Sequence, residues 1–62
     1  MTGKVKSYNP STRYGFITSG DVDYRFHIRD WGLRLPPVKD LNVEFLQTHT
    51  EKGWRATEIT HA

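Results

Sequence analysis

Residues 12–28, TRYGFITSGDVDYRFHI, decide the fold of this chain. Two short runs, YGFIT at 14–18 and YRFHI at 24–28, are rich in the aromatic and β-branched residues that favour strands. Between them lies SGD at 19–21, whose residue types are typical of tight turns. The spacing therefore predicts a β-hairpin.

The second run of this hairpin predicts which of its side chains face the protein interior. Successive side chains of a strand point to opposite faces, so Tyr24, Phe26 and Ile28 share one face. The other face carries Arg25 and His27. A dry core requires the first set to point inward, which places the two basic side chains toward solvent.

The first run leaves its orientation open. One face carries Tyr14 and Phe16, and the other carries Gly15 and Ile17, so large apolar side chains occur on both faces. Hydrophobicity alone favours burial of the two rings. The alternation pattern by itself does not decide whether the rings lie inside or outside.

The remainder of the chain adds three strands, one before the hairpin and two after it. KVKSY at 4–8 alternates Val with Lys and is followed by the turn sequence NPST. RDWGLRLPPVKD at 29–40 contains a Gly and two adjacent prolines, so it predicts an irregular connection. NVEFLQTHT at 42–50 and WRATEITHA at 54–62 are separated by a turn and complete a set of five strands.

Five short strands in 62 residues predict an all-β protein with a single domain, residues 1–62. An open sheet of this size leaves its edges exposed, whereas a closed barrel buries one face and removes the edges. The oligonucleotide-binding (OB) barrel and the SH3-like barrel both have about this number of strands. The strand count does not separate these two folds.

Composition narrows the classes of function. Nine Lys and Arg residues against seven Asp and Glu residues give a net charge of +2, a mild bias toward polyanionic partners. The chain has no Cys, which excludes disulfides and thiolate-bound zinc and predicts a cytoplasmic location. No apolar run approaches the roughly 18 residues of a membrane span, so we expect a soluble, unprocessed protein that contacts no membrane.

The chain also lacks the sequence patterns of a catalytic or cofactor site. Its three His residues have none of the short spacings of a metal site, and its Ser residues lie in no nucleophile elbow. Its five Gly residues form no phosphate-binding loop. We therefore expect no enzymatic activity, no metal and no cofactor.

Several motifs, taken in order, resemble the cold-shock domain family. GKVKSYNPSTRYGFI at 3–17 resembles the opening of that family and its first ribonucleoprotein motif, and DYRFHI at 23–28 is similar to the second. NVEF at 42–45 and EKGWRATEI at 51–59 resemble the fourth strand, the turn after it and the closing strand. The resemblance covers residues 3–60 and implies a five-stranded antiparallel OB-fold barrel that binds single-stranded RNA or DNA.

The resemblance also orients the hairpin and assigns its surface. It implies that Tyr14 and Phe16 point outward, where bases stack on them, and that Ile17 lies in the core. It implies phosphate contacts for basic side chains and a further stacking face for His27. The full set implied for nucleic-acid binding is Lys4, Lys6, Tyr8, Arg13, Tyr14, Phe16, Arg25, His27 and Trp31.

Three positions depart from the family, which has aromatic residues where this chain has Ser7, Arg25 and Ile28. Each lost stack costs about 1–3 kcal/mol in comparable sites, so we expect weaker binding unless other contacts compensate. Arg25 can compensate, because a guanidinium stacks on a base and neutralises a phosphate. Trp31 is a second candidate, with the alternative that it covers the bottom of the core. For Trp54 we predict cross-strand packing, with the alternative that it extends the contact surface together with Lys52 and Arg55.

Two interpretations of the function remain open. The first is a monomeric cold-shock-like protein that binds single-stranded RNA or DNA as a chaperone or regulator. The second is a barrel that has lost much of this surface and contacts other proteins through Trp31, Leu33, Leu35 and the two prolines that follow. The response of binding to substitution of Tyr14 or Phe16 separates the two.

Overall fold

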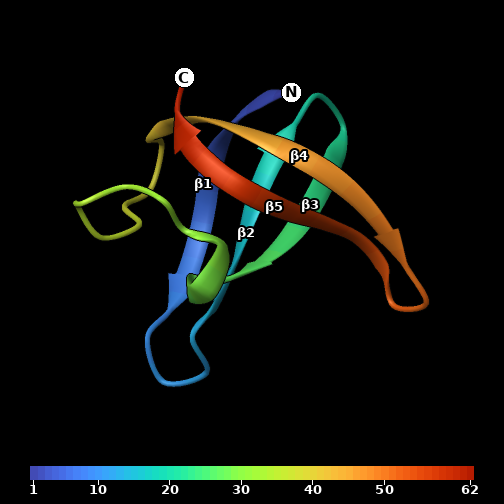
Figure 1. The fold of residues 1–62 in the computed structure, drawn as a ribbon, viewed down its shortest axis with the longest axis horizontal. Helices are drawn as coiled ribbons and strands as arrows, with labels where there is room; N and C mark the ends of the chain where they lie inside the picture. Colours follow the sequence, from blue (N-terminus) through green and yellow to red (C-terminus); the bar gives the residue numbers. More distant parts are fainter.

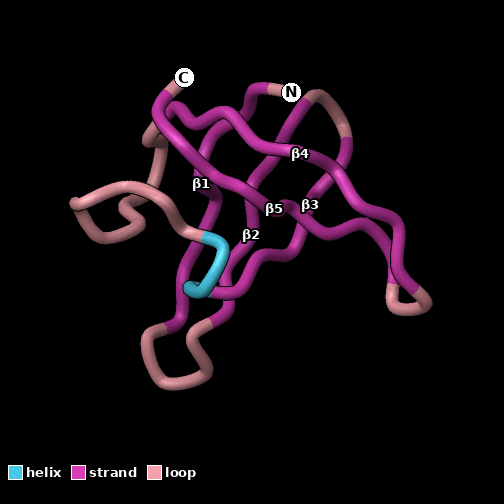
Figure 2. Tube along the Cα trace, viewed as in Figure 1, coloured by secondary structure: helices cyan, strands magenta, loops and turns pink.

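Five strands and one short 3₁₀ helix make up the computed structural model of residues 1–62. Their bounds are β1 (Thr2–Asn9), β2 (Tyr14–Ser19), β3 (Val22–His27), η1 (Ile28–Asp30), β4 (Asn42–Thr50) and β5 (Gly53–His61). The strands close into a barrel in the order β1-β2-β3-β5-β4 (Figures 1 and 2). The predicted all-β, five-stranded barrel is confirmed, and its topology is OB-like.

The strand pairs are antiparallel with one exception. β3 and β5 run parallel and pair only at Arg25 and Arg55. The exception follows from the path of the chain, because residues 31–41 cross the end of the barrel before β4 and β5 form their own antiparallel hairpin. In Figure 1 this hairpin extends beyond the rest of the barrel.

Local sequence explains where the β2–β3 hairpin turns. Gly20 has φ +61°, a left-handed backbone conformation that glycine adopts without the steric cost that a Cβ would add. The β1–β2 turn begins differently. There the Asn9 Oδ1 accepts a hydrogen bond from the Ser11 amide at 2.9 Å, a local bond that replaces the strand ladder.

The core is a single cluster of eight buried residues contributed by all five strands. They are Val5, Ile17, Tyr24, Phe26, Val43, Phe45, Ala56 and Ile59. Tyr24 and Phe26 point inward as predicted, and Ile17 is 0% exposed. The prediction that Ile28 continues this inward face is wrong, because the strand ends at His27 and Ile28 begins η1, where it is only partly buried and outside the core cluster. The open question about the first hairpin strand is thereby answered, because Tyr14 and Phe16 lie on the opposite face and are 42% and 41% exposed.

A β-bulge in β1 separates two halves of that strand. The register with β2 shifts between Val5 and Ser7, so Lys6 is an extra residue in β1. Bulges bend a strand and increase its twist, and here β1 also pairs with β4 at its first residues, Thr2 to Lys4. The bend thus lets one strand belong to both sides of the closed barrel.

The long connection after β3 covers the bottom of the core. The Trp31 ring stacks on Phe26 with centroids 5.6 Å apart, and its indole nitrogen donates a hydrogen bond to the Leu35 carbonyl at 2.7 Å. Trp31 also bridges to Ile59 of β5. This position matches the interpretation of Trp31 as a cover for the core. No helix in the structure has the length and hydropathy of a membrane span.

Candidate nucleic-acid interface

Four side chains meet on the outer side of β2 and β3. Tyr14 is paired with His27, and Phe16 is paired with Arg25, in the antiparallel register of the two strands. Residues directly opposite each other in such a pair share a face of the sheet, so the four side chains form one contiguous surface. We call this surface, made of Tyr14, Phe16, Arg25 and His27, the ring face.

Contacts within the ring face hold three of its members in place. The Tyr14 and His27 rings meet edge to face with centroids 4.8 Å apart. The Arg25 guanidinium carbon lies 5.3 Å from the centre of the Tyr14 ring, within the range of a cation–π contact. Phe16 makes no ring pair of this kind, so its 41% exposed ring is open to a partner.

The short helix η1 fixes the orientation of His27. The His27 Nδ1 accepts a hydrogen bond from the Arg29 amide at 3.0 Å and caps the helix. In the neutral ring the hydrogen is therefore on Nε2, which is free to donate. The cap on η1 thus holds the His27 ring beside Tyr14.

A cationic groove of about 360 Å³ lies beside the ring face. Tyr14 and Arg25 line it from the ring face, and the other lining residues are Thr50, Glu51, Lys52 and Arg55 from the end of β4, the β4–β5 turn and β5. The groove thus gathers three basic side chains and one acidic side chain. This arrangement is suited to an anion.

An ion pair holds Arg55, one of the residues that line the cationic groove, in position. One of its terminal nitrogens, Nη2, donates a hydrogen bond to Asp30 at 2.8 Å, in an ion pair that joins β5 to η1. Its Nε is buried and has no hydrogen-bond partner. Neither Arg55 nor Lys52 was predicted as a site residue. The available signal was their place beside Trp54 in the sequence, where basic and aromatic residues occur together.

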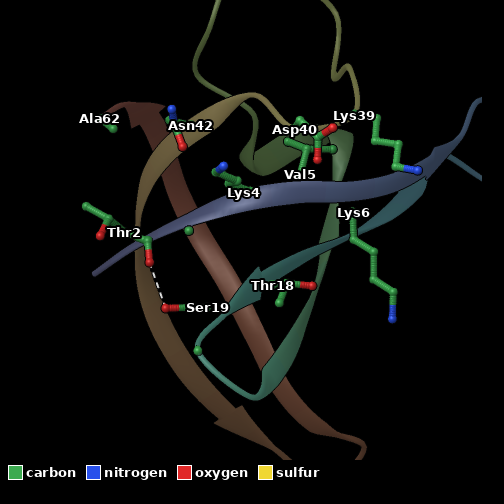
Figure 3. Close-up of a pocket in the computed structure, with 12 residues that line it drawn as sticks. Thr2, Lys4, Val5, Lys6, Thr18, Ser19, Lys39, Asp40, Asn42 and Ala62 are labelled. Atoms are coloured by element: carbon green, nitrogen blue, oxygen red, sulfur yellow. Dashed lines mark hydrogen bonds between the residues drawn. The ribbon is translucent and has the colours of Figure 1, made fainter.

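A larger groove, of about 790 Å³, lies across β1 and is shown in Figure 3. Lys4, Lys6 and Lys39 line it. In Figure 3 the side chains of Lys6 and Lys39 lie on different sides of the β1 ribbon and do not converge. Lys6 is also paired with Asp23 at 2.7 Å. This groove is less suited to a compact anion than the cationic groove, despite its greater volume.

The Lys6–Asp23 pair lies near the ring face and lowers the pKa of Asp23 from its usual 3.8, first through the Lys6 hydrogen bond and then through that of Thr18. A carboxyl group with a lowered folded-state pKa stabilises the fold above its unfolded pKa, and this contribution is lost as the pH falls through the lowered value. We therefore expect Asp23→Asn to be less stable than the wild type at neutral pH, with a difference that shrinks below about pH 4.

Urea unfolding of both proteins between neutral pH and about pH 2 measures this difference. Asp21→Asn is the matched control, because Asp21 is an exposed aspartate two residues away that has none of these hydrogen bonds. A stability difference for Asp23→Asn that is the same at every pH would contradict the prediction.

Of the remaining predicted site residues, Tyr8 and Trp31 lie away from the ring face, and Arg13 lies at one end of it. Tyr8 is half-buried and stacks on Phe26 from the core side, with centroids 6.1 Å apart. Trp31 also lies against Phe26, so the structure does not bring either ring next to Tyr14. Arg13 is exposed in the β1–β2 turn, with φ 65°, at the Tyr14 end of the ring face.

The predicted cross-strand packing of Trp54 is confirmed. Trp54 is paired with His49 across the β4–β5 hairpin, and the two rings meet edge to face with centroids 4.9 Å apart. The Trp54 ring also approaches Tyr24 at 6.1 Å. Its other side faces solvent, because the residue is 44% exposed.

Comparison with known proteins adds no family to these observations. No protein-family model matches the chain, and no curated protein matches it. The structure supports a small five-stranded barrel with OB-like topology. The functional interpretation therefore depends on the ring face and its surroundings, together with the motif resemblance.

Proposed function

We propose that this chain is a cold-shock-like protein that binds single-stranded RNA or DNA on the ring face. The observation that carries the proposal is the outward position of Tyr14 and Phe16, each more than two-fifths exposed on one face of β2. A domain of 62 residues has few apolar side chains with which to build a core. Two adjacent rings left in solvent, beside a guanidinium and an imidazole, are suited to base stacking.

The spacing of the two rings favours single strands over duplexes. Tyr14 and Phe16 are two residues apart on β2, which separates them by about 6.6 Å along the strand. Stacked bases in a duplex rise by only about 3.4 Å per nucleotide. Neighbouring bases can occupy both rings only if they no longer stack on each other, as in an extended single strand.

The chemistry of the ring face matches this role without catalysis. Each base stacked on a ring contributes about 1–3 kcal/mol in comparable sites, and Arg25 adds a charge that attracts phosphates. Binding only the unpaired form shifts the folding equilibrium of a nucleic acid by mass action, so no energy source is needed. A nucleic-acid chaperone or regulator works in this way.

The alternative function, a protein-interaction module, receives less support. Its proposed contact included Trp31, Leu33 and Leu35. Trp31 and Leu33 pack against the core cluster, and the Trp31 indole is hydrogen-bonded to the Leu35 carbonyl. These groups serve the barrel itself, whereas the rings of the ring face serve no packing role in the core.

Fluorescence anisotropy of labelled short oligothymidylate and oligouridylate strands tests the proposal. We expect saturable binding by the wild type and a loss of about 5- to 150-fold in affinity for Phe16→Ala, the equivalent of one lost stack. Leu46→Ala is the control, because Leu46 is a 54% exposed apolar residue on β4 away from the ring face. We expect it to bind like the wild type.

Repeating the titrations between about 50 mM and about 200 mM salt separates stacking from charge, because phosphate contacts make affinity fall with salt. Affinity that disappears with salt and is equal for the wild type and Phe16→Ala would contradict the proposal. The chain would then have a charged surface without a stacking site, and the protein-interaction alternative would be favoured.

A further inference from the structure

We propose that the cationic groove binds a phosphate monoester at the end of a single strand whose last base stacks on Tyr14. This inference depends on the proposed function, because the strand must first occupy the ring face. It goes beyond that function by naming a part of the ligand, a terminal phosphate, that the groove distinguishes from the phosphodiesters inside a strand.

Two arginines that line the groove are paired across neighbouring strands without a shared counter-ion. Arg25 and Arg55 are directly paired in the parallel register of β3 and β5. Like charges opposite each other on neighbouring strands destabilise a sheet. Asp30 pairs with Arg55 alone. An anion bound between the two arginines would relieve this repulsion.

Both guanidiniums are already positioned. Arg25 lies over the Tyr14 ring, which restricts its movement on one side. Arg55 is tied to Asp30 through Nη2 and keeps a buried Nε with no acceptor. Ordering these long side chains therefore costs less entropy on binding than it would for free surface arginines.

The charge of the groove favours a dianion over a monoanion. Arg25, Lys52 and Arg55 contribute three positive charges and Glu51 contributes one negative charge, so the lining residues carry +2. The groove stays positive by one charge when Asp30, which lies behind Arg55, is included. A phosphate monoester carries about −1.5 to −2 at neutral pH, whereas a backbone diester carries a single charge. In a net positive field the monoester is bound more strongly.

The location of the groove indicates that the phosphate monoester it prefers is at the end of the bound nucleic-acid strand. Tyr14 belongs both to the ring face and to the groove lining, and it is the first residue of β2. A base stacked on Tyr14 has its own phosphate within reach of the groove, on the side of the β4–β5 turn. Lys52 belongs to that turn, and no hydrogen bond or ion pair holds its side chain in the structure.

Competition experiments test the inference. An internally labelled oligothymidylate is displaced from the protein by unlabelled strands that carry hydroxyls at both ends, a 5′-phosphate or a 3′-phosphate. We expect one of the two phosphorylated strands to compete about three- to tenfold better than the strand without a terminal phosphate, as one to two added charge contacts predict. Thymidine 5′-monophosphate alone is a further competitor, which tests whether the groove binds a free nucleotide without a strand.

Two variants locate the effect. Lys52→Gln removes a groove charge at an exposed turn position and should abolish the preference for the phosphorylated strand. Lys39→Gln removes the same charge from the other groove and should keep the preference. Thermal unfolding of both variants checks that the barrel is intact.

The outcomes separate this inference from the function on which it depends. Equal competition by all three strands overturns the inference and leaves the proposed function standing. Failure of every strand to bind overturns both. A preference that is lost equally in Lys52→Gln and Lys39→Gln, or kept in both, overturns the assignment to the groove. Thymidine 5′-monophosphate competing as well as the best strand overturns the assignment to strand ends.

Discussion

Alanine at both Tyr14 and Phe16 is expected to weaken the binding of a short oligothymidylate by about 30-fold to about 10⁴-fold, the equivalent of two lost stacks. Both rings are more than two-fifths exposed, and neither belongs to the core cluster. We therefore expect the barrel to stay folded. Anisotropy titration gives the affinity, and thermal unfolding gives the stability of the same samples.

A matched double variant makes this prediction specific. Val22 and Leu46 are 37% and 54% exposed and lie outside the ring face. Val22→Ala combined with Leu46→Ala removes two exposed apolar side chains that lie outside the ring face, and we expect binding within about twofold of the wild type, as for surface residues that make no contact. Equal losses in the two double variants would mean that the rings have no special role.

Arg25 gives this experiment a second readout. Its guanidinium lies 5.3 Å from the Tyr14 ring centre, so removal of Tyr14 also removes the support that holds this charge. The charge itself remains. The residual binding of the double variant should therefore be mainly electrostatic and should decrease more steeply with salt, relative to its strength, than that of the wild type.

The strands of this fold could be predicted because local signals agreed. Each predicted run lies within an observed strand or overlaps it closely, and the irregular stretch at 29–40 lies mainly in the connection after β3. Turn-forming residues separate the runs, and alternation fixed the inward face at Tyr24 and Phe26. The closed barrel followed from the number of strands and the need to cover their edges.

The orientation of β2 could not be predicted from hydrophobicity. Both faces of its first residues carry apolar side chains, and burial of Ile17 leaves Tyr14 and Phe16 outside. Only the family resemblance favoured this choice. A physical signal was nevertheless present in Gly15, since a residue without a side chain on the inward face leaves room for a large neighbour, and Phe26 fills that room.

The cationic groove could not be predicted because it depends on non-local pairing. Arg25 and Arg55 are adjacent only through the parallel pairing of β3 with β5, after the chain has crossed the end of the barrel. The alternation of residues within either strand does not indicate which residue of the other strand lies opposite. By contrast, Tyr14, Phe16, Arg25 and His27 belong to one hairpin, so its short turn was enough to bring them together.

Gly15→Ala is expected to have the largest effect on stability. A Cβ at this position would lie 2.6 Å from the Ser7 carbonyl oxygen and 2.6 Å from the Phe26 Cζ. The first atom is backbone in the paired strand β1, and the second belongs to a side chain that is 0% exposed, so neither can move without loss of packing. We expect a loss of about 3 kcal/mol or more, at or above the upper end for overpacked cores.

A loss of this size is a large fraction of the stability of so small a domain. At the usual stability per residue, 62 residues give a free energy of unfolding of about 3–9 kcal/mol. Urea unfolding should therefore find a much lower unfolding midpoint for Gly15→Ala than for the wild type. Gly20→Asn is the control, because no atom lies within 4 Å of its Cβ position and Asn tolerates its φ of +61°.

The same substitution connects the core to the function. Gly15 lies between Tyr14 and Phe16 and faces Phe26. Because Gly15 has no side chain, Phe26 can be buried against it. The same inward position of Gly15 places its two neighbours, Tyr14 and Phe16, on the outer side of the strand. If Gly15→Ala were as stable as Gly20→Asn, β2 would have to shift away from β1, and the position of the two rings relative to the rest of the barrel would change. Measuring oligothymidylate binding of any folded fraction then distinguishes a shifted ring face from an intact one.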